Sequence, residues 1–311
     1  MNTTSLRVGT RGSRLALRQT GMVVDALRAA HPGLEFQTVT ITTGGDRDRT
    51  SPIERLGVGA FVREVEAALA RSEIDFAVHS LKDLPSTTPP EFTIAAITRR
   101  EDPRDVLVNR WGVKYGALPE GARIGTSSPR RRAQLLAVVP HVTVLSLRGN
   151  VDTRLHKCLV EPGSGYDGGV LAAAGLARMD RLDAVAEFLD PQIFTPAVGQ
   201  GMLAVETRAD DGSTTQLVNA AEDPVARAAA TAERAFLAAM GGGCAVPVTA
   251  HAFMQDQDLT VYGFASDRDG RDVIRDSVSG PSQDASRLGR LLADILLAAG
   301  ARRVLEVHAD A

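Results

Sequence analysis

Two stretches that lie far apart in the chain have nearly the same pattern. Residues 7–13 read RVGTRGS and residues 123–129 read RIGTSSP. Each has a short apolar run, then a Gly-Thr turn, then a residue suited to begin a helix. This repeat favours two similar α/β lobes, although such short strand-turn-helix joints also recur by chance.

The pattern around each repeat supports this interpretation. A chain of 311 residues is long for one core, so we expect two or three domains. Hydrophobic periodicity predicts a first set of strands at 6–10, 36–42, 74–78 and 92–97, with helices at 13–30 and 61–71. A second set has strands at 123–126, 142–147 and 168–173, with helices at 129–139 and 151–160. Strands that alternate with helices indicate a largely parallel α/β sheet in each set.

The last part of the chain has a different pattern. Strands follow one another between two helices, with helices expected at 224–239 and 285–299 and strands at 248–254, 259–265 and 273–278. Such an arrangement is typical of an antiparallel α+β domain. The predicted fold class is therefore two α/β domains and a smaller α+β C-terminal domain with a three-stranded antiparallel sheet.

Composition excludes several classes of function. The net charge of −3 and the aromatic content of 4% argue against nucleic acid as the main partner. No apolar run approaches the roughly 20 residues of a membrane span. The polar first residues lack the apolar core of a signal peptide, and two cysteines make no disulfide framework, so we expect a cytoplasmic protein.

Nearly all of the positive charge is arginine, because the chain has only three lysines. A lone arginine therefore indicates little, and only arginines at special backbone positions count. Pro129 suits the first position of a helix and Ser128 suits its cap. A helix N-terminus attracts anions, and Arg130 and Arg131 add forked donors that match carboxylate or phosphate. The alternative is a capped helix with solvated arginines.

Other basic side chains follow predicted strands. Arg11 stands with Ser13 at the first repeat, Arg148 leaves a strand, and Arg154 begins the next helix. Ligands of open α/β sheets gather at the carboxyl ends of strands, so these arginines are candidate ligand contacts. The alternative is a surface ion pair between Asp152 and a nearby arginine.

A further strand ends in the sequence VHSLKDLP at 78–85. Asp83 there is able to stabilise a developing cation and transfer protons. Lys82 leaves open a Schiff-base enzyme of the pyridoxal type. Ser80 beside His79 sits in no nucleophile-elbow pattern, which disfavours a hydrolase.

The two cysteines have different surroundings. Cys244 follows three glycines, which let the backbone approach a ligand closely, so its thiol is able to reach a cleft. Cys158 lies within a predicted helix, and we expect a small buried hydrophobe. The six histidines have no metal-ligand spacing, so we expect no metal.

Together these segments resemble the porphobilinogen deaminase (hydroxymethylbilane synthase) family. The matching pieces keep the family order over nearly the whole chain: 9–13, 78–85, 100–105, 125–131, 147–154, 174–178, 198–201, 232–234 and 242–247. The resemblance implies three domains, two of them like lobes of periplasmic binding proteins. Their expected bounds are 1–98 with 200–219, 104–195, and 222–311.

The resemblance also implies chemistry. Enzymes of this family condense four porphobilinogen molecules stepwise on a dipyrromethane cofactor, and release linear hydroxymethylbilane and ammonia. Cys244 matches the cysteine that holds the cofactor covalently, and Asp83 matches the catalytic carboxylate. The implied cofactor contacts are Lys82, Thr126, Ser128, Arg130, Arg131 and Arg154. The implied substrate contacts are Arg11, Ser13, Phe61, Arg148, Arg178 and Gln200. The family also suggests a monomer that binds porphobilinogen and the growing oligopyrrole chain.

Three places depart from the family pattern. Residues 57–60 read GVGA where many relatives carry a lysine, residues 161–165 look like a small insertion, and Gly241 replaces a common acidic residue. None removes a proposed catalytic group. The main rival is a two-lobed anion-binding protein without catalysis, which explains the repeat and the arginines but not Cys244 on its glycine-rich loop.

Overall fold

The computed structural model describes residues 5–44, 62–161, 163–241 and 246–306. The chain divides into two compact units, and each is considered by itself. The first unit combines residues 1–101 with 201–227, and the second combines 102–200 with 228–311. No helix within the described ranges is long and apolar enough to cross a membrane.

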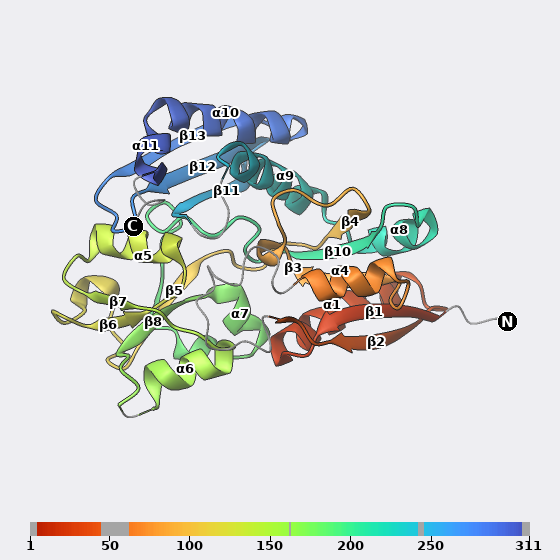
Figure 1. The fold of residues 1–311 in the computed structure, drawn as a ribbon, viewed down its shortest axis with the longest axis horizontal. Coiled ribbons are helices and arrows are strands. Elements are labelled where there is room, and N and C mark those ends of the chain that lie inside the picture. The colour runs from red at the N-terminus through yellow and green to blue at the C-terminus, as the bar shows by residue number, and fades with distance from the viewer. Residues whose placement is uncertain (1–4, 45–61, 162, 242–245, 307–311) are drawn as a thin grey trace. The chain divides into compact units, whose positions relative to one another are not determined.

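The first unit contains a five-stranded sheet, drawn in red, orange and green in Figure 1. Its order is β2-β1-β3-β10-β4, with β1 at Ser5–Arg11, β2 at Glu35–Ile41, β3 at Phe76–Ser80, β4 at Phe92–Ile97 and β10 at Leu203–Arg208. β1 pairs in parallel with β2 and β3, whereas β10 runs antiparallel between β3 and β4. The largely parallel sheet is confirmed, with one antiparallel strand that the pattern had not predicted.

Helices of this unit cover the two faces of the sheet. The side chains of β3, which alternate between these faces, show which helix lies on each. Phe76 and Val78 pack with residues of α1 (Arg14–Ala30), whereas Ala77 packs with residues of α4 (Arg63–Ala70). Successive side chains of a strand point to opposite faces. Ser80 therefore continues the α1 face and His79 the α4 face. A third helix, α8 (Gly212–Val218), follows β10.

The second unit repeats this sheet. Its order is β7-β6-β8-β5-β9, with β5 at Asp105–Asn109, β6 at Arg123–Gly125, β7 at Thr143–Leu145, β8 at Gly168–Ala172 and β9 at Glu187–Phe188. β6 pairs in parallel with β7 and β8, and β5 is the antiparallel strand. The helices are α5 (Pro129–Val138), α6 (Val151–Leu159) and α7 (Ala173–Arg178). The predicted repeat of two similar α/β folds is confirmed by this matching order.

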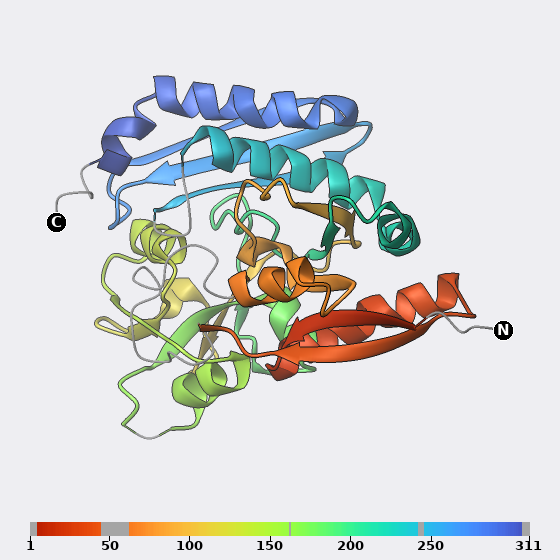
Figure 2. The same cartoon turned by 45° about the vertical axis from the view of Figure 1, so that its right-hand side comes forward.

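The second unit also contains the antiparallel sheet β11-β12-β13, drawn in blue. Its strands are β11 (Val248–Gln255), β12 (Asp258–Ser266) and β13 (Val273–Pro281), and its helices are α10 (Ala285–Ala298), α11 (Ala301–Glu306) and the part of α9 (Pro224–Ala239) from residue 228 onward. Figure 2 shows α9 and α10 alongside this sheet. A Cβ atom on Gly289 would lie 2.1 Å from the carbonyl oxygen of Ala232, so only glycine allows α10 to approach α9 so closely. The prediction of an antiparallel C-terminal sheet is confirmed.

Candidate active site

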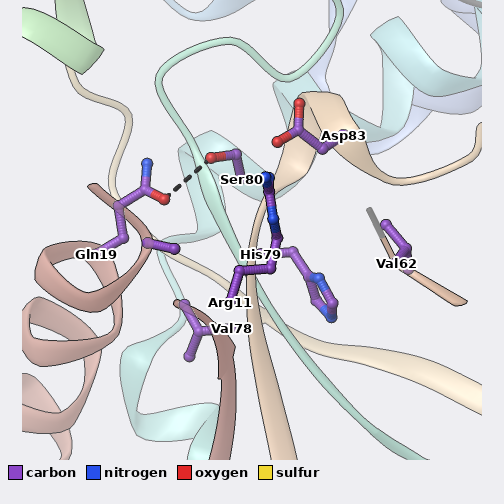
Figure 3. Close-up of a pocket in the computed structure, with 8 residues that line it drawn as sticks. Arg11, Gln19, Val62, Val78, His79, Ser80 and Asp83 are labelled. Atoms are coloured by element: carbon purple, nitrogen blue, oxygen red, sulfur yellow. Dashed lines mark hydrogen bonds between the residues drawn. The ribbon is translucent and has the colours of Figure 1, made fainter. Parts of the chain in front are cut away.

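A pocket of the first unit opens where β1 and β3 end (Figure 3). Its lining residues are Arg11, Ala16, Gln19, Val62, Val78, His79, Ser80 and Asp83. β1 ends at Arg11 and β3 ends at Ser80, so the pocket lies at the carboxyl ends of these two parallel strands. This is the edge at which open α/β sheets bind ligands.

Asp83 is positioned by a single 3₁₀ turn, Leu81–Asp83, that follows β3 directly. Leu81 is 1% exposed, and its N–H donates to the carbonyl of Met202 at 3.0 Å. The Leu84 N–H closes the turn on the Leu81 carbonyl at 3.2 Å. A buried anchor therefore holds the turn, while Asp83 itself is exposed at the pocket.

The other wall of the pocket comes from α1. Ser13 caps this helix, and its hydroxyl accepts a hydrogen bond from the Ala16 N–H at 3.2 Å. Gln19, one of the buried residues of α1, accepts a hydrogen bond from the Ser80 hydroxyl at 3.1 Å. The cap at Ser13 agrees with the sequence prediction, whereas the contact of Gln19 was not predicted. The structure brings Arg11 and Asp83 to one pocket, with Lys82 in the adjoining turn.

In the second unit, the predicted helix start at α5 is confirmed. Pro129 begins the helix, and the Ser128 hydroxyl accepts a hydrogen bond from the Arg131 N–H at 3.4 Å. Thr126 is buried, and its hydroxyl accepts from the Ser128 N–H at 3.2 Å. The local sequence therefore forms the capped helix that an anion site of this kind requires.

Arg130 and Arg131 do not project into solvent, because both are bound to Asp105 on β5. Nη1 of Arg130 lies 2.7 Å from Asp105 Oδ2, and Nη2 of Arg131 lies 2.7 Å from Oδ1. Their side chains are 6% and 8% exposed, and that of Asp105 is 0% exposed. Burial alone would raise the pKa of Asp105, but the two guanidinium groups hold it well below its usual range. The alternative of solvated arginines is therefore wrong for this pair.

Gln200 belongs to the same cluster. Its Nε2 donates to Asp105 Oδ1 at 2.8 Å and to the Pro103 carbonyl at 2.7 Å, and its Oε1 accepts from Arg131 at 3.4 Å. Gln200 is fully buried. The sequence indicated neither Asp105 nor the contact of Gln200 with Arg131, because no local pattern connects them.

The remaining arginines lie elsewhere in the second unit. Arg148 is half-buried between β7 and α6, Arg154 lies in α6, and Arg178 is buried at the end of α7. Nε of Arg154 donates to the Gly149 carbonyl at 2.8 Å, which ties the start of α6 to the preceding turn. Asp152 lies 3.9 Å from Arg181, so this aspartate has an arginine close by.

Two candidate residues, Phe61 and Cys244, lie outside the described residues. Cys158 is confirmed as a buried residue of α6, and burial raises the pKa of its thiol to about 12. Such a thiol is almost entirely protonated at neutral pH and is a poor nucleophile. Over the described ranges, no group of three or more acidic, histidine or cysteine side chains is arranged to hold a metal ion.

The donor chemistry of both units suits a ligand rich in carboxylates. Two guanidinium groups share the single carboxylate of Asp105, so that cluster retains one positive charge. Nη1 of Arg130 donates both hydrogen bonds that this side chain makes to described residues, one to Asp105 and one to the carbonyl of Thr195. The other nitrogen atoms of the guanidinium group are therefore able to donate to a ligand. Arg11 contributes another guanidinium at the pocket of the first unit.

Comparisons with known proteins agree with this chemistry. Residues 6–216 match the family described as "Porphobilinogen deaminase, dipyromethane cofactor binding domain", and residues 227–298 match "Porphobilinogen deaminase, C-terminal domain". A porphobilinogen deaminase of Roseiflexus castenholzii is 51% identical over 97% of this chain and 98% of its own length. A porphobilinogen deaminase of Syntrophotalea carbinolica is 46% identical over 98% of this chain and 96% of its own length.

Likenesses to solved structures are more distant. CbnR, a LysR family transcriptional regulator, is 11% identical with a TM-score of 0.43, covering 71% of each chain. A periplasmic solute binding protein of Bordetella bronchispeptica is 14% identical with a TM-score of 0.38, covering 70% of this chain and 78% of that one. The assignment depends on the family matches and the full-length relatives. The chain belongs to the porphobilinogen deaminase family.

Proposed function

We propose that the chain is a hydroxymethylbilane synthase, a transferase that joins four porphobilinogen molecules stepwise and releases hydroxymethylbilane and ammonia. Its dipyrromethane cofactor is attached through a thioether to Cys244. The observation that carries this proposal is the pocket where Asp83 and Arg11 meet, in a chain whose residues 6–216 match a dipyrromethane-binding domain. When bound, the cofactor would supply the pyrrole carbon to which the first ring is joined, and each later ring would join the free end of the chain that grows from it.

Asp83 is the proposed catalytic residue. Loss of ammonia and coupling of the rings both place positive charge on pyrrole nitrogen, and a nearby carboxylate stabilises that charge. The same carboxylate is a base for the proton that leaves after coupling. The exposure of Asp83 on an anchored turn supports this role, because the carboxylate reaches the ligand while its backbone stays fixed.

The arginines are proposed to bind the acetate and propionate groups. Each charge-assisted hydrogen bond contributes about 1.5–3 kcal/mol, so several of them hold an oligopyrrole firmly. Cofactor binding is assigned to Lys82, Thr126, Ser128, Arg130, Arg131 and Arg154. Substrate binding is assigned to Arg11, Ser13, Phe61, Arg148, Arg178 and Gln200. Because Gln200 is buried against Arg131, we infer that it acts on the ligand through that arginine.

The domain bounds, the oligomeric state and the cellular location are also part of this proposal. We infer three domains, at 1–98 with 200–219, at 104–195 and at 222–311, in a cytoplasmic monomer that binds neither nucleic acid nor membrane. The three separate sheets support the three domains, and the charge of −3 supports the absence of nucleic acid.

Intact-mass spectrometry of the purified protein tests the attachment. The expected mass exceeds that of the polypeptide by two porphobilinogen-derived units. Cys244→Ala loses this excess, and the matched control Cys158→Ala retains it. A wild-type protein without the adduct, even after incubation with porphobilinogen, would refute the proposal and leave the anion-binding protein as the better interpretation.

A further inference from the structure

A buried acid–base pair lies beside the pocket, and the proposed chemistry makes no use of it. Nε2 of His79 lies 3.2 Å from Oε2 of Glu206, and the two side chains are 5% and 1% exposed. His79 is on β3 and Glu206 on β10, the antiparallel neighbour of β3. In the register of these strands His79 is opposite Ala204 and Ala77 is opposite Glu206, so the pair meets diagonally on one face.

A second carboxyl group faces the same cluster. Glu66 lies on α4, the helix that packs on this face of the sheet, and its Oε1 is buried without a hydrogen-bond partner among the described residues. Burial raises the pKa of Glu66, and the negative charges of Glu206 and Glu91 raise it further, whereas His79 lowers it.

Two buried carboxyl groups with one imidazole need a proton. Neither carboxyl oxygen of Glu206 has a hydrogen-bond partner in the described part of the chain, and the residue is 0% exposed. A buried carboxylate is strongly disfavoured unless a cation or a proton compensates it. Nε2 of His79 is close enough to Glu206 for a proton shared between the two side chains to compensate the buried carboxyl group.

The pair is connected with the chemistry through β3. His79, Ser80 and Asp83 line the same pocket, and Figure 3 shows the imidazole turned to the other side of β3 from the Ser80 hydroxyl. The Ser80 hydroxyl donates to Gln19 of α1, while the imidazole of His79 lies beside Glu206 of β10 on the opposite face of the sheet. A change of charge in the pair therefore acts on Asp83 from behind the strand.

We propose that Glu66, His79 and Glu206 form a buried proton-holding cluster, in which His79 is a positioning residue whose charge sets the pH dependence of turnover at Asp83. This inference rests on the proposed role of Asp83. Among the described residues, Glu91 acts on Glu66 through its charge, Arg11 and Asp83 line the pocket, and Lys82 precedes Asp83 in the same turn.

The reaction explains why such a cluster matters. At coupling, a pyrrole C–H bond breaks, its electron pair returns to the ring, and Asp83 accepts the proton. The ammonia released from the same substrate molecule takes up one proton and leaves as ammonium, so protons balance over each cycle. Asp83 must be ionised when each cycle begins, and a fixed imidazolium behind it favours the ionised form.

Two substitutions of similar size test the proposal by the direction of their effects. Glu206→Gln leaves the imidazolium of His79 without its counter-charge, which favours the ionised form of Asp83. The acid limb of the plot of kcat against pH is therefore expected to move to lower pH. His79→Gln leaves a buried carboxyl group instead, so the limb moves to higher pH. We expect each shift of the acid limb to be about half a pH unit. This is the size that Coulomb's law gives for two unit charges about 10 Å apart in a solvent-screened site. Glu73→Gln, a change at an exposed glutamate after α4, leaves the limb in place.

If His79 and Glu206 only stabilised the fold, both substitutions would lower kcat at every pH and leave the acid limb of the plot of kcat against pH unchanged. That outcome, or shifts of both variants in one direction, overturns the proposal. Thermal unfolding of each variant separates loss of fold from change of charge.

A measurement that needs no turnover decides the same question. The ring nitrogens of His79, observed by ¹⁵N NMR at pH 7, are expected in the imidazolium form in the wild type. A neutral ring in the wild type overturns the proposal, even if both variants fail to fold. Failure of the proposed function is distinguishable, because it appears as undiminished turnover in Asp83→Ala while the His79 signals stay as expected.

Discussion

Arg131 and Asp105 form a buried ion pair in which Nη2 lies 2.7 Å from Oδ1 and Nε lies 3.1 Å from the same oxygen. Arg130 occupies the other carboxylate oxygen at 2.7 Å. One carboxylate thus keeps two like charges together at the start of α5. Without it, two guanidinium groups would remain buried and repel each other.

Asp105→Asn is therefore expected to destabilise the protein by about 3–5 kcal/mol, the usual cost of leaving buried charge uncompensated. Denaturant unfolding measures this change. The control is Asp210→Asn, since Asp210 is exposed and its substitution should change stability by less than about 0.5 kcal/mol. Equal stability of the two variants would contradict the role given to Asp105.

Asp83→Ala is expected to lower kcat by at least about 100-fold, because it removes a positioned acid–base group. The fold should persist, since the side chain is exposed and the turn is held by Leu81. A steady-state assay with porphobilinogen, together with circular dichroism, checks both expectations. The control is Asp25→Ala at an exposed position of α1, and turnover of Asp83→Ala at its level would remove Asp83 from the mechanism.

Acid is expected to weaken the second unit through Asp167. Hydrogen bonds from the Arg123 side chain are the main reason why the pKa of Asp167 falls to about 2. A lowered folded-state pKa means that this stabilisation is complete above about pH 4 and is lost as pH falls through 2. Because Arg123 is 46% exposed, we expect only about 1–2 kcal/mol. Urea titrations at pH 7 and pH 3 should show a smaller loss in Asp167→Asn than in the wild type, and an equal loss would contradict the assignment.

A thiol count gives a fourth prediction. The pKa of the Cys158 thiol is raised to about 12 by burial, so folded protein should not react with iodoacetamide at pH 8 at this position. After unfolding, wild type and Cys244→Ala should each expose one thiol, and Cys158→Ala none, because the proposed thioether blocks Cys244. Two thiols in the unfolded wild type would exclude that thioether.

Much of the fold could be predicted because its signals are local. The caps at Ser13 and Ser128, the proline at the first position of α5, and the strand-turn-helix repeat lie within a few residues each. Their physical causes are hydrogen bonds and dihedral preferences that depend on nearby residues only. The same reasoning predicted four strands of the first five-stranded sheet and three of the second, together with the helices between them.

The two antiparallel strands could not be predicted in this way. β10 includes the buried polar residues Glu206 and Thr207, so its sequence reads as half-exposed although it lies in the middle of a sheet. β5 begins at Asp105 directly after a charged stretch, and that aspartate is buried only because two arginines reach it. In both strands a tertiary partner compensates a polar residue, and no local pattern reveals the partner.

In the candidate site too, the local features could be predicted from the sequence and the tertiary contacts could not. The sequence predicted Arg130 and Arg131 as anion contacts from their place at a helix start, but it could not show that both bind Asp105. Nor could it show that Gln200 lies against Arg131, since that contact depends on how the chain returns after the second sheet. Likewise the pair of His79 and Glu206 exists only because β3 and β10 become neighbours.

The position of β10 has a consequence for the way the chain is made. A ribosome completes every strand of the second five-stranded sheet, from residue 105 to residue 188, before it reaches residue 203. Until then β3 lacks one neighbour, and β4 lacks the strand with which it pairs in the finished sheet. Domains generally fold as units during synthesis. The sheet that begins the polypeptide is therefore the later of the two to close, and a nascent chain arrested before residue 203 should contain the second sheet and only the β2-β1-β3 part of the first.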